Sequence, residues 1–327
     1  MKRVLVTGVT GLLGANTVVA LLELGYHVNA FVRSKSKVVL GKHPSLSIYE
    51  GDFNMVSDLE KAMIDCSFLV HAAAETGQAH SGKIAYVESN INFTKKLYEV
   101  AVRLGVKRLV HVSTSNVFGF GNLHQLGDEL TPIQKPFSQS HYVKSKLAAQ
   151  EWALALPESI EVVIVNPTFM IGPLDQKPSS GKIIFHGFKK RVAFYPPGGK
   201  NFIDVRDAAL GIVAALEIGV DRESYVLAGE NLSYFSFFDK IRRNSPYNPR
   251  LIKIPKFILL TMGILGGFFQ RFGLKTSITL TNMQILCVEN YYSNGKARRA
   301  LGLATRPIDQ SINDAIAWFR SNGKIPQ

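Results

Sequence analysis

The stretch SHYVKSK, residues 140–146, places a tyrosine four positions before a lysine. In a helix this spacing puts both side chains on one face, one turn apart. The pKa of a free phenol is about 10, and a neighbouring ammonium group lowers it. Tyr142 and Lys146 are therefore a candidate acid–base pair. The same spacing also arises by chance, so it indicates chemistry only where the rest of the chain builds a site around it.

Three hydroxyl side chains form a second candidate group. Ser113, Thr114 and Ser115 follow the apolar run RLVHV, which is typical of a buried strand. Hydroxyls at a strand end can orient a substrate oxygen by hydrogen bonding, or they can simply close the strand. The residues alone leave both interpretations open.

A glycine-rich turn near the N-terminus is typical of a phosphate site. VTGVTGLLG lies between an apolar strand and a helix predicted at residues 12–24, which Gly25 ends. Gly8 allows a tight turn, Gly11 lets backbone amides approach a pyrophosphate, and Gly14 lets helix and strand pack closely. The spacing is G-x-x-G-x-x-G, which departs from the G-x-G-x-x-G fingerprint. The predicted phosphate-binding residues are Gly8, Thr10, Gly11, Leu12, Leu13 and Gly14.

Charges at the end of the next predicted strand indicate which dinucleotide binds. An NAD site usually has an acid here for the ribose hydroxyls, whereas the 2′-phosphate of NADP needs cations. In FVRSKSK the strand ends at Arg33, with Lys35 and Lys37 behind it and no acid in the stretch. We therefore predict NADP, with NAD less favoured, and Arg33 and Lys37 as ligands of the 2′-phosphate. The alternative is that these are ordinary exposed loop charges.

Two further strand ends complete the predicted cofactor site. EGDF places Asp52 where it can accept a hydrogen bond from the adenine amino group, with Phe53 beside the ring. HAAA ends a strand in small residues, which let a cofactor lie against the backbone. His71 is predicted to be a packed histidine at the strand end and not a ligand. The small residues assigned to the cofactor are Ala72, Ala73 and Ala74.

The elements around these residues alternate between short apolar strands and helices. This alternation predicts an α/β fold, a Rossmann-type doubly wound parallel sheet with helices on both faces. We assign residues 1–166 to this cofactor-binding domain, to which residues 203–228 return through a helix with Asp207 as its N-cap. Residues 167–327 are predicted to form a smaller, mostly helical substrate-binding lobe.

Composition excludes several classes of protein. The chain is 46% hydrophobic and 19% charged, which excludes a disordered chain. Cys66 and Cys287 are far apart and in no metal-ligand spacing, so we expect no metal, no disulfide framework and a reducing, cytoplasmic location. The net charge of +13 comes from short basic clusters without interleaved aromatics, so no nucleic acid is expected. The positive charge then belongs either to a solvated basic surface or to a surface that attracts an anionic ligand or membrane.

Motifs along the chain resemble those of the extended short-chain dehydrogenase/reductase superfamily, the NAD-dependent epimerase/dehydratase family. They are, in the family's order, TGVTGLLG, GDF, HAAA, NINFT, VSTSNVFG, YVKSK, NPTFMIGP and FIDVRDAA. One position departs from the nucleotide-sugar epimerases of this family, which usually carry an asparagine where this chain has Phe169. The apolar residue is more similar to the dihydroflavonol 4-reductase and 3β-hydroxysteroid dehydrogenase branches.

The resemblance implies a role for each matching residue. Tyr142 would be the general acid/base, and Thr114 would bind the substrate oxygen. Lys146 would bind the nicotinamide ribose and, together with the oxidised nicotinamide, lower the tyrosine pKa. Ser115, next to Thr114, could also bind the substrate oxygen. Asn90 in NINFT would form hydrogen bonds to nearby backbone or to a water. The remaining assignments are Ser113 and Pro167 to the cofactor, and Ser115 and Phe169 to the substrate.

These expectations leave two catalytic functions. The first is an NADP-dependent oxidoreductase that transfers a hydride between the nicotinamide and a carbonyl or secondary alcohol of a fairly apolar small molecule. The second is a nucleotide-sugar epimerase or dehydratase with tightly held NAD(P). A non-catalytic NADP sensor is disfavoured, because a binding module needs no proton donor. The family also implies a homodimer through the helices that contain Asn90 and Tyr142. Candidate diphosphate ligands for an epimerase are Arg242, Arg243, Arg250 and Lys253.

The apolar segment FILLTMGILGGFF, residues 257–269, is too short to span a bilayer. We interpret it either as a wall or lip of the substrate pocket that touches an anionic membrane, or as a helix buried in the C-terminal lobe. The basic residues that flank it are Lys253, Lys256, Arg271 and Lys275.

Overall fold

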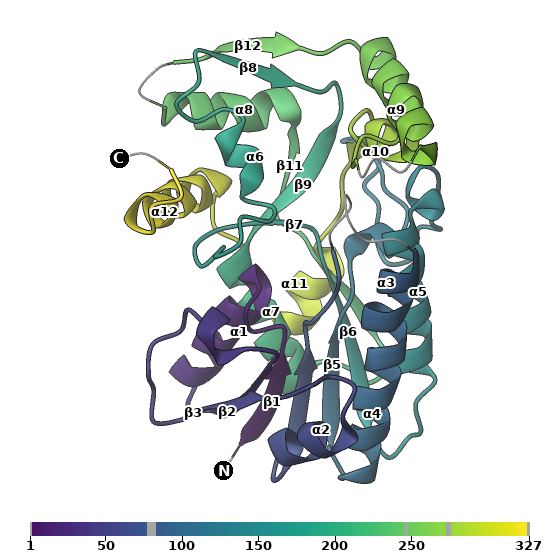
Figure 1. Cartoon of the computed structure of the whole chain (residues 1–327), viewed down its shortest axis with the longest axis vertical. Coiled ribbons are helices and arrows are strands. Elements are labelled where there is room, and N and C mark those ends of the chain that lie inside the picture. The colour runs from purple at the N-terminus through teal and green to yellow at the C-terminus, as the bar shows by residue number, and fades with distance from the viewer. Residues whose placement is uncertain (1, 77–82, 246–247, 273–275, 326–327) are drawn as a thin grey trace.

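Seven strands form the central sheet of the computed structural model, which describes residues 2–76, 83–245, 248–272 and 276–325 (Figure 1). Their order is β3-β2-β1-β4-β5-β6-β10, and every neighbouring pair is parallel. The strands are β1 (Arg3–Thr7), β2 (His27–Val32), β3 (Leu46–Glu50), β4 (Phe68–His71), β5 (Arg108–Val112), β6 (Glu161–Pro167) and β10 (Ser224–Leu227). This topology confirms the predicted Rossmann-type sheet.

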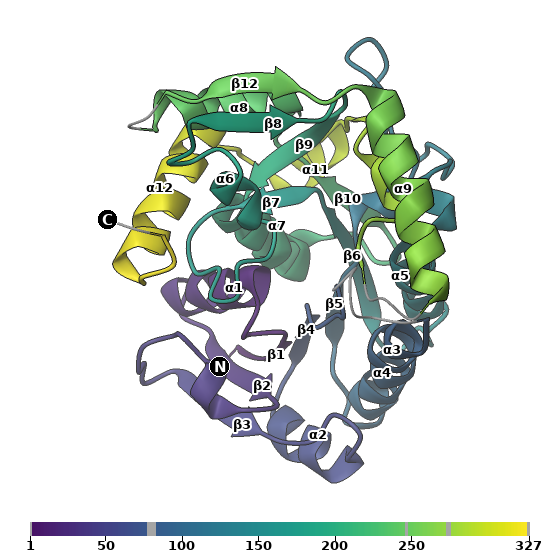
Figure 2. The same ribbon diagram turned by 45° about the horizontal axis from the view of Figure 1, so that its top comes forward.

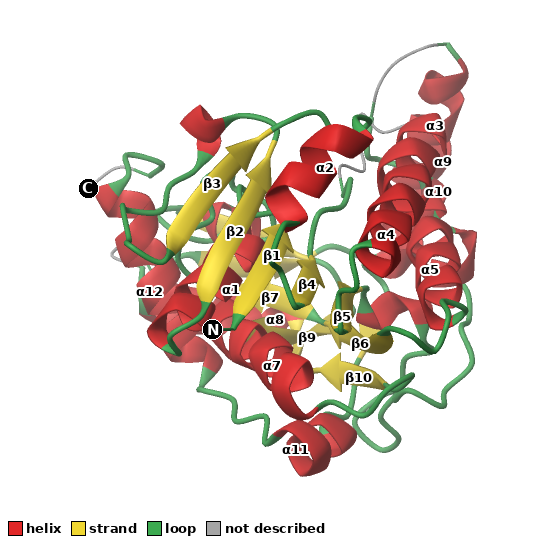
Figure 3. Cartoon of the chain, turned by 90° about the horizontal axis from the view of Figure 1, so that it is seen from below, coloured by secondary structure: helices red, strands yellow, loops and turns green. Residues whose placement is uncertain are grey.

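Apolar side chains on both faces of these strands explain why helices cover the sheet on both sides (Figure 3). One face packs against α1 (Leu12–Glu23), α7 (Val205–Ile218) and α11 (Gly295–Leu301). The other packs against α2 (Val56–Met63), α4 (Phe93–Arg103) and α5 (His141–Leu154). Helix α3 (Lys83–Tyr86) runs into α4 through the π-helical segment η2 (Val87–Asn92). Single 3₁₀ turns are η1 (Lys35–Lys37), η3 (Ser115–Val117) and η4 (Phe137–Gln139).

The C-terminal lobe lies beyond the carboxyl edge of the sheet (Figures 1 and 2). It holds one small sheet of β7 (Phe169–Ile171), β9 (Gly199–Asp204), β11 (Glu230–Ser233) and β13 (Glu289–Asn290), and a pair of β8 (Val192–Tyr195) and β12 (Arg250–Lys253). Its helices are α6 (Lys182–Phe185), α8 (Tyr234–Arg243), α9 (Lys256–Arg271), α10 (Leu280–Ile285) and α12 (Ile308–Ser321). The lobe is mostly helical, as predicted; its strands are only two to six residues long, too short to give a clear alternating pattern in the sequence.

Helix α7 begins before its predicted cap. Strand β9 ends at Asp204, whose carboxylate accepts a hydrogen bond from the Arg206 amide at 2.8 Å and so caps the helix. Asp207 lies within the first turn, where its carboxylate accepts a hydrogen bond from Arg306 Nε at 2.8 Å. The prediction of Asp207 as N-cap was wrong, because another aspartate follows the strand directly and takes that position.

Helix α9 is exposed along one side, and this side includes Phe257 at 69% and Ile264 at 60% exposure. The alternative that residues 257–269 form a fully buried helix is therefore wrong. In the described part of the chain, no helix combines the length and apolar character needed to cross a membrane.

We expect Gly14→Ala to lower the free energy of unfolding by about 1–3 kcal/mol, as overpacking does. A Cβ on Gly14 would lie 2.2 Å from the Gly8 carbonyl oxygen, so α1 approaches the turn this closely only with glycine there. Gly267→Ala in α9 is the matched control, because a Cβ there meets no atom within 4 Å and alanine favours a helix. Urea unfolding followed by circular dichroism measures both; an equal effect at the two sites would contradict the close approach.

Candidate active site

Adjacent strands bring the predicted site residues to the carboxyl edge of the sheet (Figure 2). The glycine turn follows β1, residues 72–74 follow β4, residues 113–115 follow β5, and β6 ends at Pro167. The strand order reverses between β1 and β4, which is where open parallel sheets bind ligands. Helix α5 adds Tyr142 and Lys146 at the end of β5.

Lys146 is buried against the end of β5. Its side chain is 3% exposed, and Nζ donates a hydrogen bond to the Val112 carbonyl at 2.6 Å. Burial lowers the pKa of Lys146 from 10.5 to about 7. The amine is therefore held in one position and titrates near neutral pH.

This pKa predicts a pH dependence of stability with a definite sign. The unfolded chain keeps the Lys146 proton up to a pKa near 10.5, whereas the folded protein, without cofactor, releases it at about 7. The unfolded state therefore binds more protons between these values, so stability rises with pH there, by at most about 1.4 kcal/mol per pH unit. Urea unfolding of the wild type and of Lys146→Met from about pH 7 to about pH 9 should show their difference growing in favour of the wild type. Parallel curves would contradict the shifted pKa.

Tyr142 lies one turn before Lys146, with its phenol facing Thr114. Burial raises the pKa of Tyr142 to about 12, the Thr114 hydroxyl lowers it by hydrogen bonding, and Tyr86 adds to the increase. The Tyr86 and Tyr142 ring centroids are 6.1 Å apart. The expected lowering of this pKa depends on the oxidised nicotinamide as well as on Lys146, so it stays a prediction. In the protein alone the phenol is protonated at neutral pH.

Two buried amides that the sequence analysis missed hold the backbone at Thr114. Asn166 Nδ2 donates to the Thr114 carbonyl at 3.1 Å and to Gln150 Oε1 at 3.0 Å. Asn166 is fully buried in β6, and Gln150 is on α5 two turns after Tyr142. These hydrogen bonds connect β6, α5 and the backbone at Thr114. Two features of the sequence could have identified these residues. Asn166 directly precedes Pro167, and Gln150 is spaced from Tyr142 so that both lie on one face of a helix.

Asn90 links α5 to the loop after β4. Its Nδ2 donates to Ser145 Oγ at 2.9 Å, and its Oδ1 accepts from the Glu75 amide at 2.7 Å. Ser145 Oγ in turn donates to the Tyr142 carbonyl at 2.7 Å. Asn90 lies in the π-helical segment η2, a geometry often found at functional sites. It thus holds the backbone of the first turn of α5.

The two serines beside Thr114 have different surroundings. Ser113 is 6% exposed, and its hydroxyl has no hydrogen-bond partner among the described residues. A buried hydroxyl without a partner is uncommon and fits a cofactor group at this strand end. Ser115 is 2% exposed and lies beside the Tyr292 phenol. Thr114 is therefore the hydroxyl of the three that faces Tyr142.

The glycine turn fits a pyrophosphate. Gly8 has φ +80°, and a Cβ there would lie 2.6 Å from the Ala72 carbonyl carbon, so the position requires glycine. Gly11 precedes α1, and no described side chain caps this helix. Unbonded N–H groups and the positive end of the helix dipole attract phosphate. Thr10, Ala72, Ala73 and Ala74 are half-buried around this turn, and Leu12 and Leu13 are buried in the first turn of α1.

His71 is a packed histidine, as expected. Its Nδ1 lies 2.7 Å from Thr7 Oγ1, and its Nε2 lies 2.9 Å from Thr94 Oγ1. Burial, together with the charge of Lys146, lowers the pKa of His71 to about 3. The ring is therefore neutral and acts in packing.

The exposed Arg33 lies beside the half-buried ring of Phe53 at the ends of β2 and β3. The Arg33 guanidinium carbon lies 5.7 Å from the Phe53 ring centroid. Phe53 also stacks on Phe93, with ring centroids 4.5 Å apart. This packing holds the Phe53 ring, on which Arg33 lies, in place. Asp52, directly before Phe53, is exposed. The arrangement offers a guanidinium and a carboxylate to a nucleotide lying over the strand ends.

Sheet pairing brings an acid into the loop that follows β2. Glu50 ends β3 opposite Val32, and its carboxylate accepts a hydrogen bond from the Lys35 amide at 2.7 Å. The sequence stretch from Arg33 to Lys37 holds no acid, but the folded loop does have one beside it. Lys37 is exposed in η1. Glu50 therefore offsets part of the positive charge predicted here.

The strand end after Pro167 combines an aromatic ring with an unexpected lysine. Pro167 is buried, and Phe169 is half-buried with its ring 5.5 Å from that of Phe202. Lys200 Nζ lies 5.2 Å from the Phe169 ring centroid. Burial lowers the pKa of Lys200 to about 8, and within the described ranges it forms no ion pair. The sequence analysis missed Lys200, because a single lysine in the strand GKNFID gave no signal of its own.

Apolar side chains surround Tyr142. The ring packs in a cluster with Phe137 of η4 and Phe118, and Ile285 of α10 and Val288 join the same cluster. Helix α9 packs on α10 from outside. Ile285 of α10 therefore brings the region next to α9 into the apolar cluster of Tyr142, whereas a pocket wall formed by residues 257–269 themselves stays a prediction.

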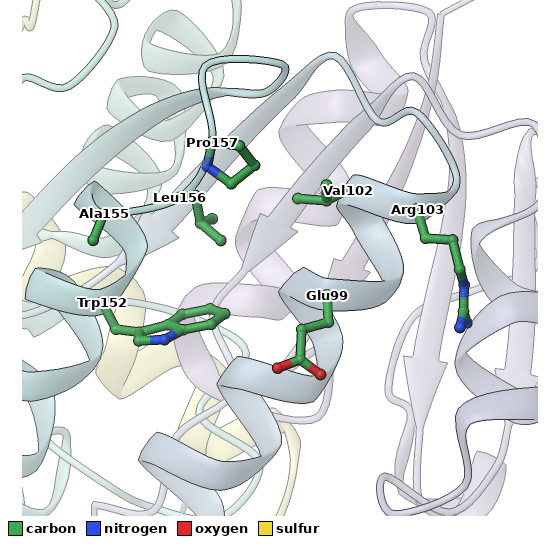
Figure 4. Close-up of a pocket in the computed structure, with 7 residues that line it drawn as sticks. All are labelled: Glu99, Val102, Arg103, Trp152, Ala155, Leu156 and Pro157. Atoms are coloured by element: carbon green, nitrogen blue, oxygen red, sulfur yellow. The ribbon is translucent and has the colours of Figure 1, made fainter.

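A surface hollow of about 390 Å³ lies away from these residues, between the C-terminal ends of α4 and α5 (Figure 4). It is lined by Glu99, Val102, Arg103, Trp152, Ala155, Leu156 and Pro157. No predicted site residue lines it, and it lies at the amino edge of the sheet, opposite the candidate active site.

Comparison with known proteins identifies the family. Residues 4–228 match the NAD dependent epimerase/dehydratase family. A relative from Synechocystis, named provisionally as a dihydroflavonol 4-reductase, is 31% identical over 329 residues, 98% of this chain and 95% of the relative. Sterol demethylase protein B of Methylococcus capsulatus is 28% identical over 327 residues, 98% of this chain and 99% of the relative.

The fold comparison agrees with this result. The crystal structure of gox2253 matches with a TM-score of 0.86 at 27% identity, and the match covers 100% of both chains. The chain therefore belongs to the NAD-dependent epimerase/dehydratase family and is an NAD(P)-dependent oxidoreductase of the extended short-chain dehydrogenase/reductase type.

Proposed function

We propose that the protein is an NADP-dependent reductase or dehydrogenase acting on a carbonyl or secondary alcohol of a fairly apolar small molecule. The observation that carries this proposal is the grouping of Thr114, Tyr142 and Lys146 within apolar surroundings at the end of β5. Hydride transfer to a carbonyl needs a proton for the oxygen, and this group offers one from a fixed position.

Each residue has a distinct task in carbonyl reduction. NADPH, when bound, supplies the hydride to the carbonyl carbon. The hydroxyls of Thr114 and Tyr142 hold the substrate oxygen, and Tyr142 gives it a proton as negative charge develops. A phenol pKa of about 12 keeps this proton in place until then. Lys146 lies one turn away, and its protonated amine stabilises the tyrosinate that remains after the transfer. Oxidation of an alcohol uses the same groups in reverse.

The substrate's apolar character is inferred from the wall of the site. Phe118, Phe137 and Ile285 belong to the same apolar cluster as Tyr142, and Phe169 stands where an epimerase usually has an asparagine. The names of these two relatives, from Synechocystis and Methylococcus capsulatus, refer to a dihydroflavonol and a sterol, both largely apolar. A carbonyl carried on a fused or aromatic ring system suits such a wall.

Consumption of NADPH tests this proposal. The purified protein is given NADPH and, separately, a dihydroflavonol and a 3-ketosteroid, and nicotinamide absorbance is followed over many turnovers. We expect stoichiometric oxidation with at least one apolar carbonyl. Interconversion of a UDP-sugar without net oxidation of NADPH would overturn the proposal.

The second candidate function is a nucleotide-sugar epimerase or dehydratase, and Lys200 is the observation that favours it. An ammonium group next to Phe169 without an ion pair among the described residues suits an anionic substrate. Of the four cations proposed from the sequence, Arg242 and Arg243 support it less, because both pair with Asp239. Retention of the cofactor through gel filtration would favour this candidate, since an epimerase reuses its cofactor.

We also infer a homodimer and a cytoplasmic location. The segment η2 that holds Asn90, with α4 behind it, and helix α5 would form the dimer face, and the half-buried Trp152 and Leu156 line the hollow between the ends of α4 and α5. Sedimentation equilibrium of the wild type tests the dimer. Cys66 and Cys287 are both free thiols, which suits a reducing compartment.

A further inference from the structure

Helix α9 carries a continuous apolar face that nothing in the described structure covers. It lies at the outer edge of the molecule in both views (Figures 1 and 2). Monomeric proteins rarely expose a large apolar patch unless it binds something. We call this patch the α9 surface; its members are Phe257, Ile258, Met262, Ile264, Leu265, Phe268, Phe269 and Phe272.

The opposite face of α9 fixes this orientation. Leu259 is buried, and a Cβ on Gly263 or Gly266 would lie 2.8 Å from Leu280 or 1.8 Å from the Ile278 carbonyl oxygen. The helix therefore packs on the segment that leads into α10 through its glycines, with no room for side chains there. It cannot turn its phenylalanines inward without losing that contact.

The polar side chains Thr261 and Gln270 of this helix form hydrogen bonds within the protein. Thr261 is the polar side chain within residues 257–269, and its hydroxyl donates to the Phe257 carbonyl at 2.9 Å. Gln270, just beyond, donates from Nε2 to the Thr276 carbonyl at 2.8 Å. The α9 surface can thus enter an apolar medium without leaving a polar side chain unsatisfied.

Positive charge lies at the border of the α9 surface. Lys253 at the end of β12 and Lys256 at the start of α9 are exposed, and neither forms an ion pair with a described residue. Arg250 is exposed on the same strand. Lys275 lies outside the described residues. A second copy of this chain would bring these like charges together, whereas an anionic surface would neutralise them.

We propose that the α9 surface docks on an anionic lipid bilayer, with α9 lying in the plane of the interface. Its phenylalanines and leucine enter the boundary of the acyl chains, and Lys253 and Lys256 lie at the headgroups. Helix α10, on the inner side of α9, carries Ile285 into the apolar cluster around Tyr142. Docking would therefore place the substrate side of the protein at the membrane. This last consequence rests on the proposed function, whereas the docking does not.

Vesicle flotation of the full chain tests the proposal. We expect the wild type to float with vesicles of phosphatidylcholine and phosphatidylglycerol in equal parts, to float less with pure phosphatidylcholine, and to be released by high salt. Ile264→Ser with Phe268→Ser should reduce the bound fraction at least about tenfold. The matched control is Ile64→Ser with Ile218→Ser, two isoleucines that are 56% and 60% exposed at the other end of the molecule. This control should float as the wild type does.

A second pair of variants tests the charge. Lys253→Glu with Lys256→Glu should weaken flotation on the mixed vesicles, whereas Lys42→Glu with Lys107→Glu, exposed lysines at the amino edge of the sheet, should not. The proposal is overturned if the wild type does not float. It is overturned too if the two double variants to serine, or the two double variants to glutamate, lose the same share of vesicle binding. It is also overturned if the Ile264 and Phe268 changes turn a dimer into a monomer in sedimentation, because a second copy would then cover α9. None of these measurements requires turnover, so failure of the proposed reaction leaves them interpretable.

Discussion

Replacing Tyr142 with phenylalanine is expected to lower kcat by about 10²–10⁴-fold while the Kd for NADPH stays nearly unchanged. The change removes the proton donor and keeps the ring, which still packs against Tyr86 and the apolar cluster. Without the phenol, no acid is held beside the substrate oxygen, which must then take its proton from water. Initial rates of NADPH oxidation give kcat, and nicotinamide fluorescence gives the Kd.

Two other variants make the result specific to the proton. Tyr86→Phe removes a neighbouring phenol 6.1 Å away and should cost far less activity. Lys146→Met should lower both turnover and cofactor affinity, because Lys146 is assigned to the nicotinamide ribose as well as to the tyrosinate. Near-full activity in Tyr142→Phe would show that another group supplies the proton.

Residues close in sequence made much of this site predictable. The glycine turn is complete within residues 8–14, and the Tyr142–Lys146 spacing lies within one helix, so each pattern carries its own geometry. The alternation of strands and helices then fixed the order in which these local pieces meet at one sheet edge, because parallel strands end together. Local patterns therefore sufficed for the fold and for the catalytic candidates.

Contacts between distant segments were not predictable in this way. Asn166 meets Thr114 and Gln150 only because β6 lies beside β5 and α5 covers them. Glu50 reaches Lys35 through the register of β2 and β3, which no feature of FVRSKSK encodes. The pKa of Tyr142 depends on burial by several elements at once. Each of these facts needs the packed molecule.

Cofactor choice is the second prediction with a large effect, and it depends on one guanidinium. A 2′-phosphate carries nearly two negative charges, and a planar guanidinium can meet it with two parallel hydrogen bonds. Arg33 stands where an NAD enzyme keeps an acid, on a Phe53 ring that is itself stacked from behind. We expect NADPH to bind at least about tenfold more tightly than NADH. In Arg33→Asp the preference should reverse, a change of about a hundredfold in the ratio of Kd values, or about 2.8 kcal/mol.

The charges around Arg33 provide graded controls for this reversal. Lys37→Ala should weaken NADPH binding without reversing the preference, because a flexible ammonium acts as a point charge on an exposed turn. Glu50→Gln removes the acid that the fold brings beside the loop, so it should tighten NADPH and leave NADH little changed. Fluorescence titration of both cofactors into the wild type and the three variants measures all four ratios. Equal affinities in the wild type, or tighter NADH, would show that Arg33 does not meet the ribose phosphate and that the positive loop is a solvated surface.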